Sequence, residues 1–214
     1  MSHIISPAMK TIRILLLLAL PFCSFSQLTE NKFHVLAKYS VGKVATANYS
    51  NFSLAGEWFV HPNIGLNYSF EWMERSDNIR QVHTPMGIVG GPILIVGSFL
   101  SSNGDSTKSG IGAALGILLL VLPDGVSFHL PASYKWDISP YANVLGLDFI
   151  RDRNMGRSYL KYACSFGLKS TYGLTEKLKL TAFLETRQAA RFGWSFGGGI
   201  GLGMVFGNRS ESNE

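Results

Sequence analysis

Serine, histidine and acidic residues, which carry out nucleophilic catalysis in many enzymes, recur along this chain. Those that the strand pattern described below places on one common face are His34, Ser127, His129, Asp148 and Ser165. A hydrolase needs its nucleophile within hydrogen-bond reach of a base that a third group orients. No local motif surrounds either serine, and the opposite, apolar face offers no serine–histidine pair at usable spacing. We therefore predict no catalytic residues and interpret this set as polar filling of an enclosed interior.

The sequence also gives no sign of a metal or a cofactor. Its histidines do not have the spacing of metal ligands. The glycine-rich run at 196–201 lies within a strand and does not open a helix, so it does not match a phosphate-binding loop. We expect neither a metal site nor a bound cofactor.

Charged residues of both signs share the polar face with the serines and histidines. The members of this set are Lys38, Glu57, Glu71, Asp148, Lys161, Lys179, Glu185 and Arg187. The interior of an eight-stranded barrel is just wide enough for side chains to fill it, and charges buried there must be paired. We predict a network of internal salt bridges that closes the lumen. The alternative is a narrow ion path lined by the same groups.

Three arginines, Arg151, Arg153 and Arg157, fall in one predicted outer loop. Guanidinium groups bind phosphate in a bidentate manner, so this loop is a candidate contact for lipopolysaccharide. The alternative is a solvated loop that Asp152 partly neutralises.

These side chains must be positioned by β-strands, because the chain alternates between apolar and polar residues with a period of two. The pattern is longest near the end of the chain, at 178–187 and 192–206. Lysine, glutamate and arginine occupy strand centres on the polar face, so we expect this face to line a lumen and the apolar face to contact lipid. A sheet that spans a bilayer must close, since an open edge leaves backbone groups unpaired in hydrocarbon. The prediction is an all-β fold, a closed antiparallel transmembrane β-barrel.

The same alternation yields eight strands, three before residue 76 and five after residue 125. Their expected ranges are 32–42, 49–60, 64–72, 126–130, 138–150, 159–169, 178–187 and 192–206. With a periplasmic N-terminus, the connections at 61–63, 133–135 and 172–176 are short periplasmic turns, as is usual for these barrels, and those near 43–48, 74–125, 151–157 and 188–191 lie outside. Within 138–150, the expected outward residues are Tyr141, Asn143, Leu145, Leu147 and Phe149. The composition agrees, because only 15% of residues are charged while glycine (23 residues) and aromatic residues (12%) are abundant.

Residues 85–122 break the pattern and form an apolar insert between predicted strands three and four. The runs 85–100 and 110–122 are apolar on both faces, and a polar link joins them. One interpretation is a pair of short helices, which Gly112 and Gly116 at four-residue spacing favour. Another is two further strands, giving ten, and a third is a membrane-spanning helical hairpin, although both runs are shorter than the roughly 20 residues needed. The insert is also a candidate gate for a hydrophobic ligand.

The start of the chain is typical of a secretory signal peptide. Lys10 and Arg13 precede an apolar run at 14–20, and small residues follow, so we predict cleavage after Ser26 and a mature barrel domain at 27–214. The formal net charge of +5, which includes these two cations, is too small to argue for a nucleic-acid partner. One cysteine, Cys164, remains after cleavage and falls on the apolar face.

The chain as a whole resembles the small outer-membrane β-barrel proteins of the OmpA/OmpX type. The resemblance rests on the signal peptide, the alternating strands and the last strand, which ends Gly-Leu-Gly-Met-Val-Phe at 201–206. It implies export to the outer membrane of a Gram-negative cell envelope, insertion by the barrel assembly machinery, and contact with outer-membrane lipid and lipopolysaccharide. The tail at 207–214 and the apolar insert depart from the usual pattern.

The expected role is therefore structural or surface-interacting, without enzymatic activity. A porin-like transporter or binder of hydrophobic small molecules, gated by 85–122, is the alternative, and a lipid-modifying enzyme is a third possibility.

Overall fold

The computed structural model describes residues 33–101, 106–189 and 193–207. The predicted signal peptide, residues 1–26, and most of the tail lie outside these ranges. Among the described residues, no helix is both long enough and apolar enough to cross a membrane.

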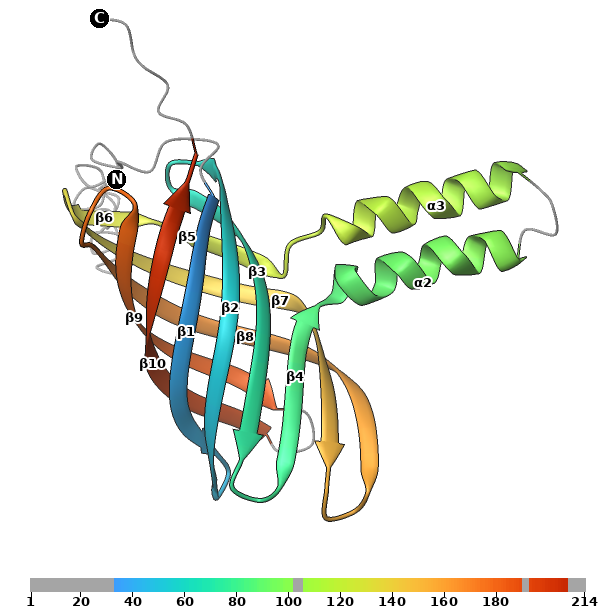
Figure 1. Ribbon diagram of the computed structural model, residues 1–214, viewed down its shortest axis with the longest axis horizontal. Helices are drawn as coiled ribbons and strands as arrows, with labels where there is room; N and C mark the ends of the chain where they lie inside the picture. Colours follow the sequence, from blue (N-terminus) through green and yellow to red (C-terminus); the bar gives the residue numbers. More distant parts are fainter. Residues whose placement is uncertain (1–32, 102–105, 190–192, 208–214) are drawn as a thin grey trace, which may run out of the picture.

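Antiparallel strands form a closed ring in which the first and last strands pair along their whole length (Figure 1). The strands are β1 (Phe33–Val44), β2 (Ala47–His61), β3 (Ile64–Arg75), β4 (Ile79–Pro85), β5 (Gly125–Phe128), β6 (Leu130–Ser133), β7 (Trp136–Asp152), β8 (Arg157–Gly173), β9 (Leu178–Ala189) and β10 (Gly193–Phe206). Both β4 and β5 pair with β3 on one side and with β7 on the other, so they share one position in the ring. Strand β6 follows β5 in the chain, pairs with β7 and belongs to the same position. The ring therefore has eight positions, which confirms the eight-stranded barrel, and the ten-stranded alternative is wrong.

The alternation of side chains is that of a barrel with an apolar exterior. On β2, Phe52 is 56% exposed while its neighbour Ser53 is 2% exposed. On β10, Ile200 is 64% exposed and faces outward between glycines. A soluble sheet would bury these apolar residues, because burial of apolar area drives folding in water. The outer wall is thus suited to contact with lipid.

One strand departs from the predicted register. A β-bulge in β7 at Val144 and Leu145 shifts the pairing with β8. The extra residue changes which face each side chain takes. Tyr141 and Asn143, predicted to face outward, are therefore buried in the lumen at 7% and 5% exposure, whereas Phe149 faces outward as predicted.

The apolar insert forms two helices, α2 (Met86–Ser101) and α3 (Ser106–Leu120), as the first interpretation predicted. They run side by side as a hairpin that projects away from the barrel wall, across the direction of the strands (Figure 1). Glycines line the contact between them. A Cβ on Gly91 would lie 2.7 Å from the carbonyl oxygen of Gly116, and a Cβ on Gly112 would lie 2.2 Å from Cβ of Ser98. Only residues without side chains allow the two backbones to approach so closely.

The place of the insert differs from the expectation, because it interrupts the fourth strand and does not precede it. Residues 79–84, predicted to belong to an outer connection, form β4 and pair with both β3 and β7. The outward side chain of Arg80 and the polar inward residues Gln81 and His83 obscure the alternation that marks the other strands. The chain leaves the wall after Pro85 and returns at Asp124.

Candidate functional site: the barrel lumen

The half of the lumen farther from Phe33 and Phe206 contains a cluster of paired charges around Arg187. Its Nη1 lies 2.8 Å from Oε2 of Glu71, and its Nη2 lies 3.6 Å from Oδ1 of Asp148. These side chains are almost fully buried, with Arg187 at 2% exposure and Asp148 at 0%. Such charges are stable only when they are paired and hydrogen-bonded.

Neutral partners complete this cluster. The amide of Asn51 donates to Oε2 of Glu71 at 2.7 Å, and the amide of Gln81 donates to Oδ2 of Asp148. The Nδ1 atom of His83 lies 2.8 Å from Oδ1 of Asp148. These contacts use acceptor positions of the carboxylates that a single arginine leaves open.

A second cluster surrounds Glu57, nearer the end of the barrel where β1 begins and β10 ends. Its Oε1 accepts from Nζ of Lys169 at 2.8 Å and lies 2.9 Å from Nε2 of His129. The other oxygen lies 3.7 Å from Nδ1 of His34. The contact with Lys169 joins β2 to β8 on the opposite side of the ring, so the cluster bridges the lumen.

Within this cluster, Ser127, His129 and Asp137 are linked through side-chain contacts in the same serine–histidine–aspartate arrangement as a catalytic triad. The Ser127 hydroxyl lies 3.2 Å from Nε2 of His129, and Nδ1 of that ring contacts Oδ2 of Asp137. Two features argue against nucleophilic catalysis. Ser127 is 0% exposed, and its hydroxyl donates to Glu57, a carboxylate that would oppose a developing oxyanion. The arrangement is better described as a polar cluster in the lumen.

A cavity beside this cluster has a volume of about 30 Å³. The residues that line this cavity include Lys38 on β1, Glu57 on β2, Asn143 on β7 and Lys169 on β8. A cavity of this size holds about two water molecules and excludes a substrate. No group of three or more histidine, cysteine or acidic residues suited to a metal occurs among the described residues.

Most residues of the predicted lumen network face the interior, but they do not form one group. Those that are buried are Lys38, Glu57, Glu71, Asp148, Glu185 and Arg187. Glu185 accepts a hydrogen bond of 2.7 Å from the hydroxyl of Tyr141. The ammonium of Lys38 lies 5.0 Å from the centre of the Phe183 ring.

The remaining two predicted residues, Lys161 and Lys179, are less enclosed. Lys161 lies opposite Asp148 in the β7–β8 register yet is exposed. Among the described residues, the pairing of β8 with β9 begins at Ser165 and Arg187. Lys179 is partly exposed.

The structure adds residues to the clusters that the alternation pattern did not single out. Asn51, Gln81, His83 and Asp137 all contact buried charges. Asp124, in the gap between β4 and β5, is 0% exposed, and its Oδ2 accepts from the Ser69 amide at 2.6 Å and the Ser69 hydroxyl at 2.7 Å. Only the position of Asp124 next to an apolar run could have marked it in the sequence.

The three arginines of the β7–β8 hairpin, Arg151, Arg153 and Arg157, are all exposed at the end of the barrel away from the start of β1 and the end of β10. Asp152 between them is buried, and its Oδ1 accepts from the backbone amides of Asn154 and Met155 at 3.0 and 3.1 Å. Its carboxylate is thus engaged in the turn and does not pair with the arginines through these contacts.

Comparison with solved structures finds small membrane barrels. The N-terminal β-barrel domain of Pseudomonas aeruginosa OprF matches with a TM-score of 0.52 at 11% sequence identity, over 83% of this chain and 98% of that chain. The fold is that of the small outer-membrane β-barrels of the OmpA/OmpX type.

Two other solved barrels are similar at slightly lower scores. OprG from Pseudomonas aeruginosa has a TM-score of 0.49 at 8% identity, over 86% of this chain and 100% of that chain. Ail of Yersinia pestis has a TM-score of 0.47 at 10% identity, over 83% of this chain and 100% of that chain. No protein-family model matches the sequence, and no curated protein matches it significantly. The outer-membrane barrel likeness therefore concerns the fold alone.

Proposed function

We propose that the protein is an integral outer-membrane barrel with a sealed lumen, which has a structural or surface-interaction role and catalyses no reaction. The observation that carries this proposal is the filling of the lumen by buried, paired charges, with a cavity of only about 30 Å³ near the Glu57 cluster. A channel needs a continuous water-filled path, and an eight-stranded ring has little room for one.

The proposal includes its route to the membrane. Residues 1–26 direct export and are removed, and residues 27–214 form the mature barrel domain. The last strand, which ends at Phe206, is the segment that the barrel assembly machinery would bind. In this orientation the end with Phe33 and Phe206 faces the periplasm, and the β7–β8 hairpin faces the outside.

Conductance in planar lipid bilayers tests the sealed lumen. We expect the unmodified protein to give no steady channels, because the Arg187 and Glu57 clusters block the path at two levels. The double variant Glu71→Ala/Arg187→Ala, which empties the first cluster, should conduct more often than the variant Arg80→Gln, which changes an exposed pair at the rim. Steady channels in the unmodified protein would contradict the sealed-lumen proposal.

Surface interaction is assigned to Arg151, Arg153 and Arg157, for which the proposed ligand is the phosphate of lipopolysaccharide. Their exposure and the engagement of Asp152 in its turn support this assignment. A charge-assisted hydrogen bond contributes about 1.5–3 kcal/mol, so loss of even one should weaken binding about tenfold or more.

The corresponding experiment compares binding of lipopolysaccharide to the barrel in micelles for two variants. Arg151→Gln/Arg153→Gln/Arg157→Gln removes the proposed site, and Lys43→Gln is the control because Lys43 is an exposed cation beside the β1–β2 turn, at the same end of the barrel but on a strand that does not pair with β7 or β8. Equal affinity in both variants would remove the arginines from the proposed surface.

The alternative of a transporter for hydrophobic small molecules, gated by 85–122, has little support. Asp124 fills the gap between β4 and β5 with hydrogen bonds to β3, and its carbonyl oxygen accepts from the amides of Val144 and Leu145 at 2.8 Å. A gate at this place would have to break all of these contacts.

A further inference from the structure

The α2–α3 hairpin has an unusual surface for a protein segment outside a core. Residues 86–101 and 110–121 contain no charged residue. Large apolar side chains are exposed on both helices, for example Ile93 (67%), Leu100 (78%), Ile117 (58%) and Leu118 (62%). A helix that is apolar all round is stable only inside a protein or a membrane. Among the residues that the structure describes, the hairpin contacts the barrel only at its base, so no described segment covers it.

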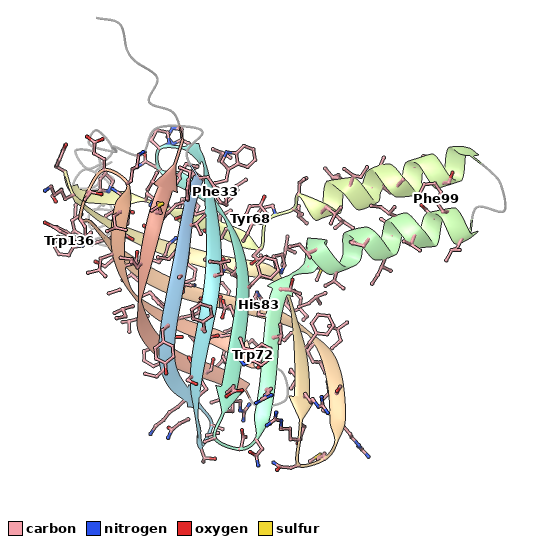
Figure 2. All side chains as sticks on the ribbon, in the orientation of Figure 1. Phe33, Tyr68, Trp72, His83, Phe99 and Trp136 are labelled. Atoms are coloured by element: carbon pink, nitrogen blue, oxygen red, sulfur yellow. The ribbon has the colours of Figure 1, made fainter. Side chains whose placement is uncertain are left out.

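The height at which the hairpin leaves the barrel indicates what surrounds it. On β3, the outward row runs through Ile64, Leu66, Tyr68, Phe70 and Trp72 before the charged Glu74. The gap between β4 and β5 faces Tyr68 and Ser69, because Gly125 pairs with Asn67 and His83 pairs with Glu71. The hairpin thus leaves the wall from the middle of its apolar band. Figure 2 shows Tyr68 beside the base of the hairpin, between the levels of Phe33 and Trp72.

Several backbone groups at this gap have partners within the protein. Pro85 and Pro123 flank the hairpin and have no N–H to pair. The Asp124 amide donates to the carbonyl of Asn67 at 2.7 Å, and the Tyr68 hydroxyl donates to the carbonyl of Val121 at 2.8 Å. Helix ends normally leave carbonyls for water to bind, and in hydrocarbon each unpaired group costs several kilocalories per mole. The outward-facing Tyr68 supplies a partner where water is absent.

We propose that the α2–α3 hairpin lies within the hydrocarbon layer of the membrane, along its plane, with phospholipid acyl chains covering its exposed side chains. This inference rests on the membrane location in the proposed function. The helices are about 24 and 22 Å long at 1.5 Å per residue, and they run across the strand direction (Figure 1). Because the apolar band of such barrels is about 25 Å tall, a hairpin that starts in its middle and runs sideways keeps its uncharged parts, 86–101 and 110–121, inside it. The polar link between them carries Asp105 and Lys108 in the sequence and must reach the headgroup layer under this proposal, since a charged side chain is costly in hydrocarbon.

Acyl chains fit this surface better than a second copy of the chain. The exposed side chains of the hairpin continue the lipid-facing surface of the barrel without a polar boundary. The close-packing glycines Gly87, Gly91, Gly112 and Gly116 are already used between α2 and α3. Lipid tails are as apolar as leucine, so bulky aliphatic side chains need no shape-matched partner in hydrocarbon.

The test measures the surroundings of spin labels at single cysteines in the full mature chain, reconstituted in phosphatidylcholine vesicles. Cys164 is first replaced in a Cys164→Ser background. The hairpin variants are Ile93→Cys and Ile117→Cys, the barrel-belt control is Phe70→Cys, and the outer-turn control is Met155→Cys, all at exposed positions. Collision rates with oxygen, which dissolves in lipid, and with a water-soluble nickel chelate report the local solvent. Heat modifiability on gels confirms that each variant is folded.

We expect both hairpin labels to match Phe70→Cys, with high oxygen and near-zero nickel collision rates, and to differ from Met155→Cys. Hairpin labels that collide with nickel as Met155→Cys does, while Phe70→Cys remains in lipid, would overturn the hairpin proposal and leave the barrel in the membrane. Nickel access at Phe70→Cys would instead contradict the proposed membrane location itself. Spin–spin broadening at the hairpin that disappears on dilution with unlabelled protein would assign the surface to a second copy and overturn the lipid proposal.

Discussion

Arg187 is the residue on which one half of the lumen depends. It is buried between Glu71 and Asp148, which themselves bond to Asn51, Gln81 and His83. Removal of charge from water costs several kilocalories per mole per ion, and only good pairing compensates for it. The cluster is therefore intolerant of changes that remove one partner alone.

Replacement of Arg187 by methionine should destabilise the barrel by about 3–5 kcal/mol, because it leaves the buried carboxylates of Glu71 and Asp148 without their guanidinium partner. The control is Arg80→Gln, which breaks an exposed pair with Glu74 and should cost about 0–1 kcal/mol. Guanidinium unfolding of the barrel in vesicles, followed by tryptophan fluorescence, measures both. The double variant Glu71→Gln/Arg187→Met should recover part of the loss, and an equal cost for Arg187→Met and Arg80→Gln would contradict this account.

The sequence placed Glu71, Asp148 and Arg187 on one face, but it did not show that they meet. The pairing joins residues 116 positions apart, so it depends on ring closure and on the register of every strand between them. Polar residues such as Gln81 and His83 acquired a role only because β4 turned out to be part of the wall.

At the scale of single elements, the hairpin is held together by close contact of its two backbones. A Cβ on Gly91 would come within 2.6 Å of Cγ of Leu120, whereas a Cβ on Gly90 would meet nothing within 4 Å. These adjacent glycines therefore form a matched pair, one in the helix contact and one outside it.

Gly91→Ala should loosen the hairpin, while Gly90→Ala should leave it unchanged or stabilise it by about 0.5–1 kcal/mol through helix propensity. Amide hydrogen exchange of residues 86–101 and 110–120 in micelles, measured by mass spectrometry, distinguishes the two. We expect faster exchange in Gly91→Ala only. Equal exchange in both variants would show that the close contact does not stabilise the hairpin.

The bulge in β7 interrupts the alternation of inward and outward side chains within a single strand. Strict alternation predicted Tyr141 and Asn143 on the lipid face, where an asparagine is out of place. The extra residue at Val144 and Leu145 turns both inward, and the two amides freed there donate to the carbonyl of Asp124. The bulge thus accommodates the return of the chain from the hairpin, a contact between segments that the local sequence does not reveal.

At the scale of the whole molecule, the hairpin is inserted into one strand without shifting the register of that strand against β3. On β3, His83 pairs with Glu71 and Gly125 pairs with Asn67. Counting along the two segments places Pro85 opposite Ser69 and Asp124 opposite Tyr68, so the positions on either side of the hairpin are consecutive in the sheet.

A variant lacking residues 86–123, with Pro85 joined to Asp124, should therefore form a continuous fourth strand and a closed eight-stranded barrel. Circular dichroism and heat-modifiable migration on gels measure whether the barrel forms, and the spectrum should lose only its helical component. The control is a deletion of the same span plus Asp124, which shifts the strand by one residue and reverses its two faces. Failure of the first deletion to fold, with normal expression, would mean that the hairpin is needed for assembly.

The sequence by itself determined the class of fold and most of the outward apolar rows, and it favoured eight strands and a helical insert over the alternatives of ten strands and a strand insert. These follow from local periodicity, because a period of two fixes which face each side chain takes wherever the strand is regular. Tertiary structure alone decided which charges pair across the lumen, where the bulge falls and that the hairpin leaves from the middle of the wall. Those features depend on register between strands distant in the chain, and no local pattern encodes that register.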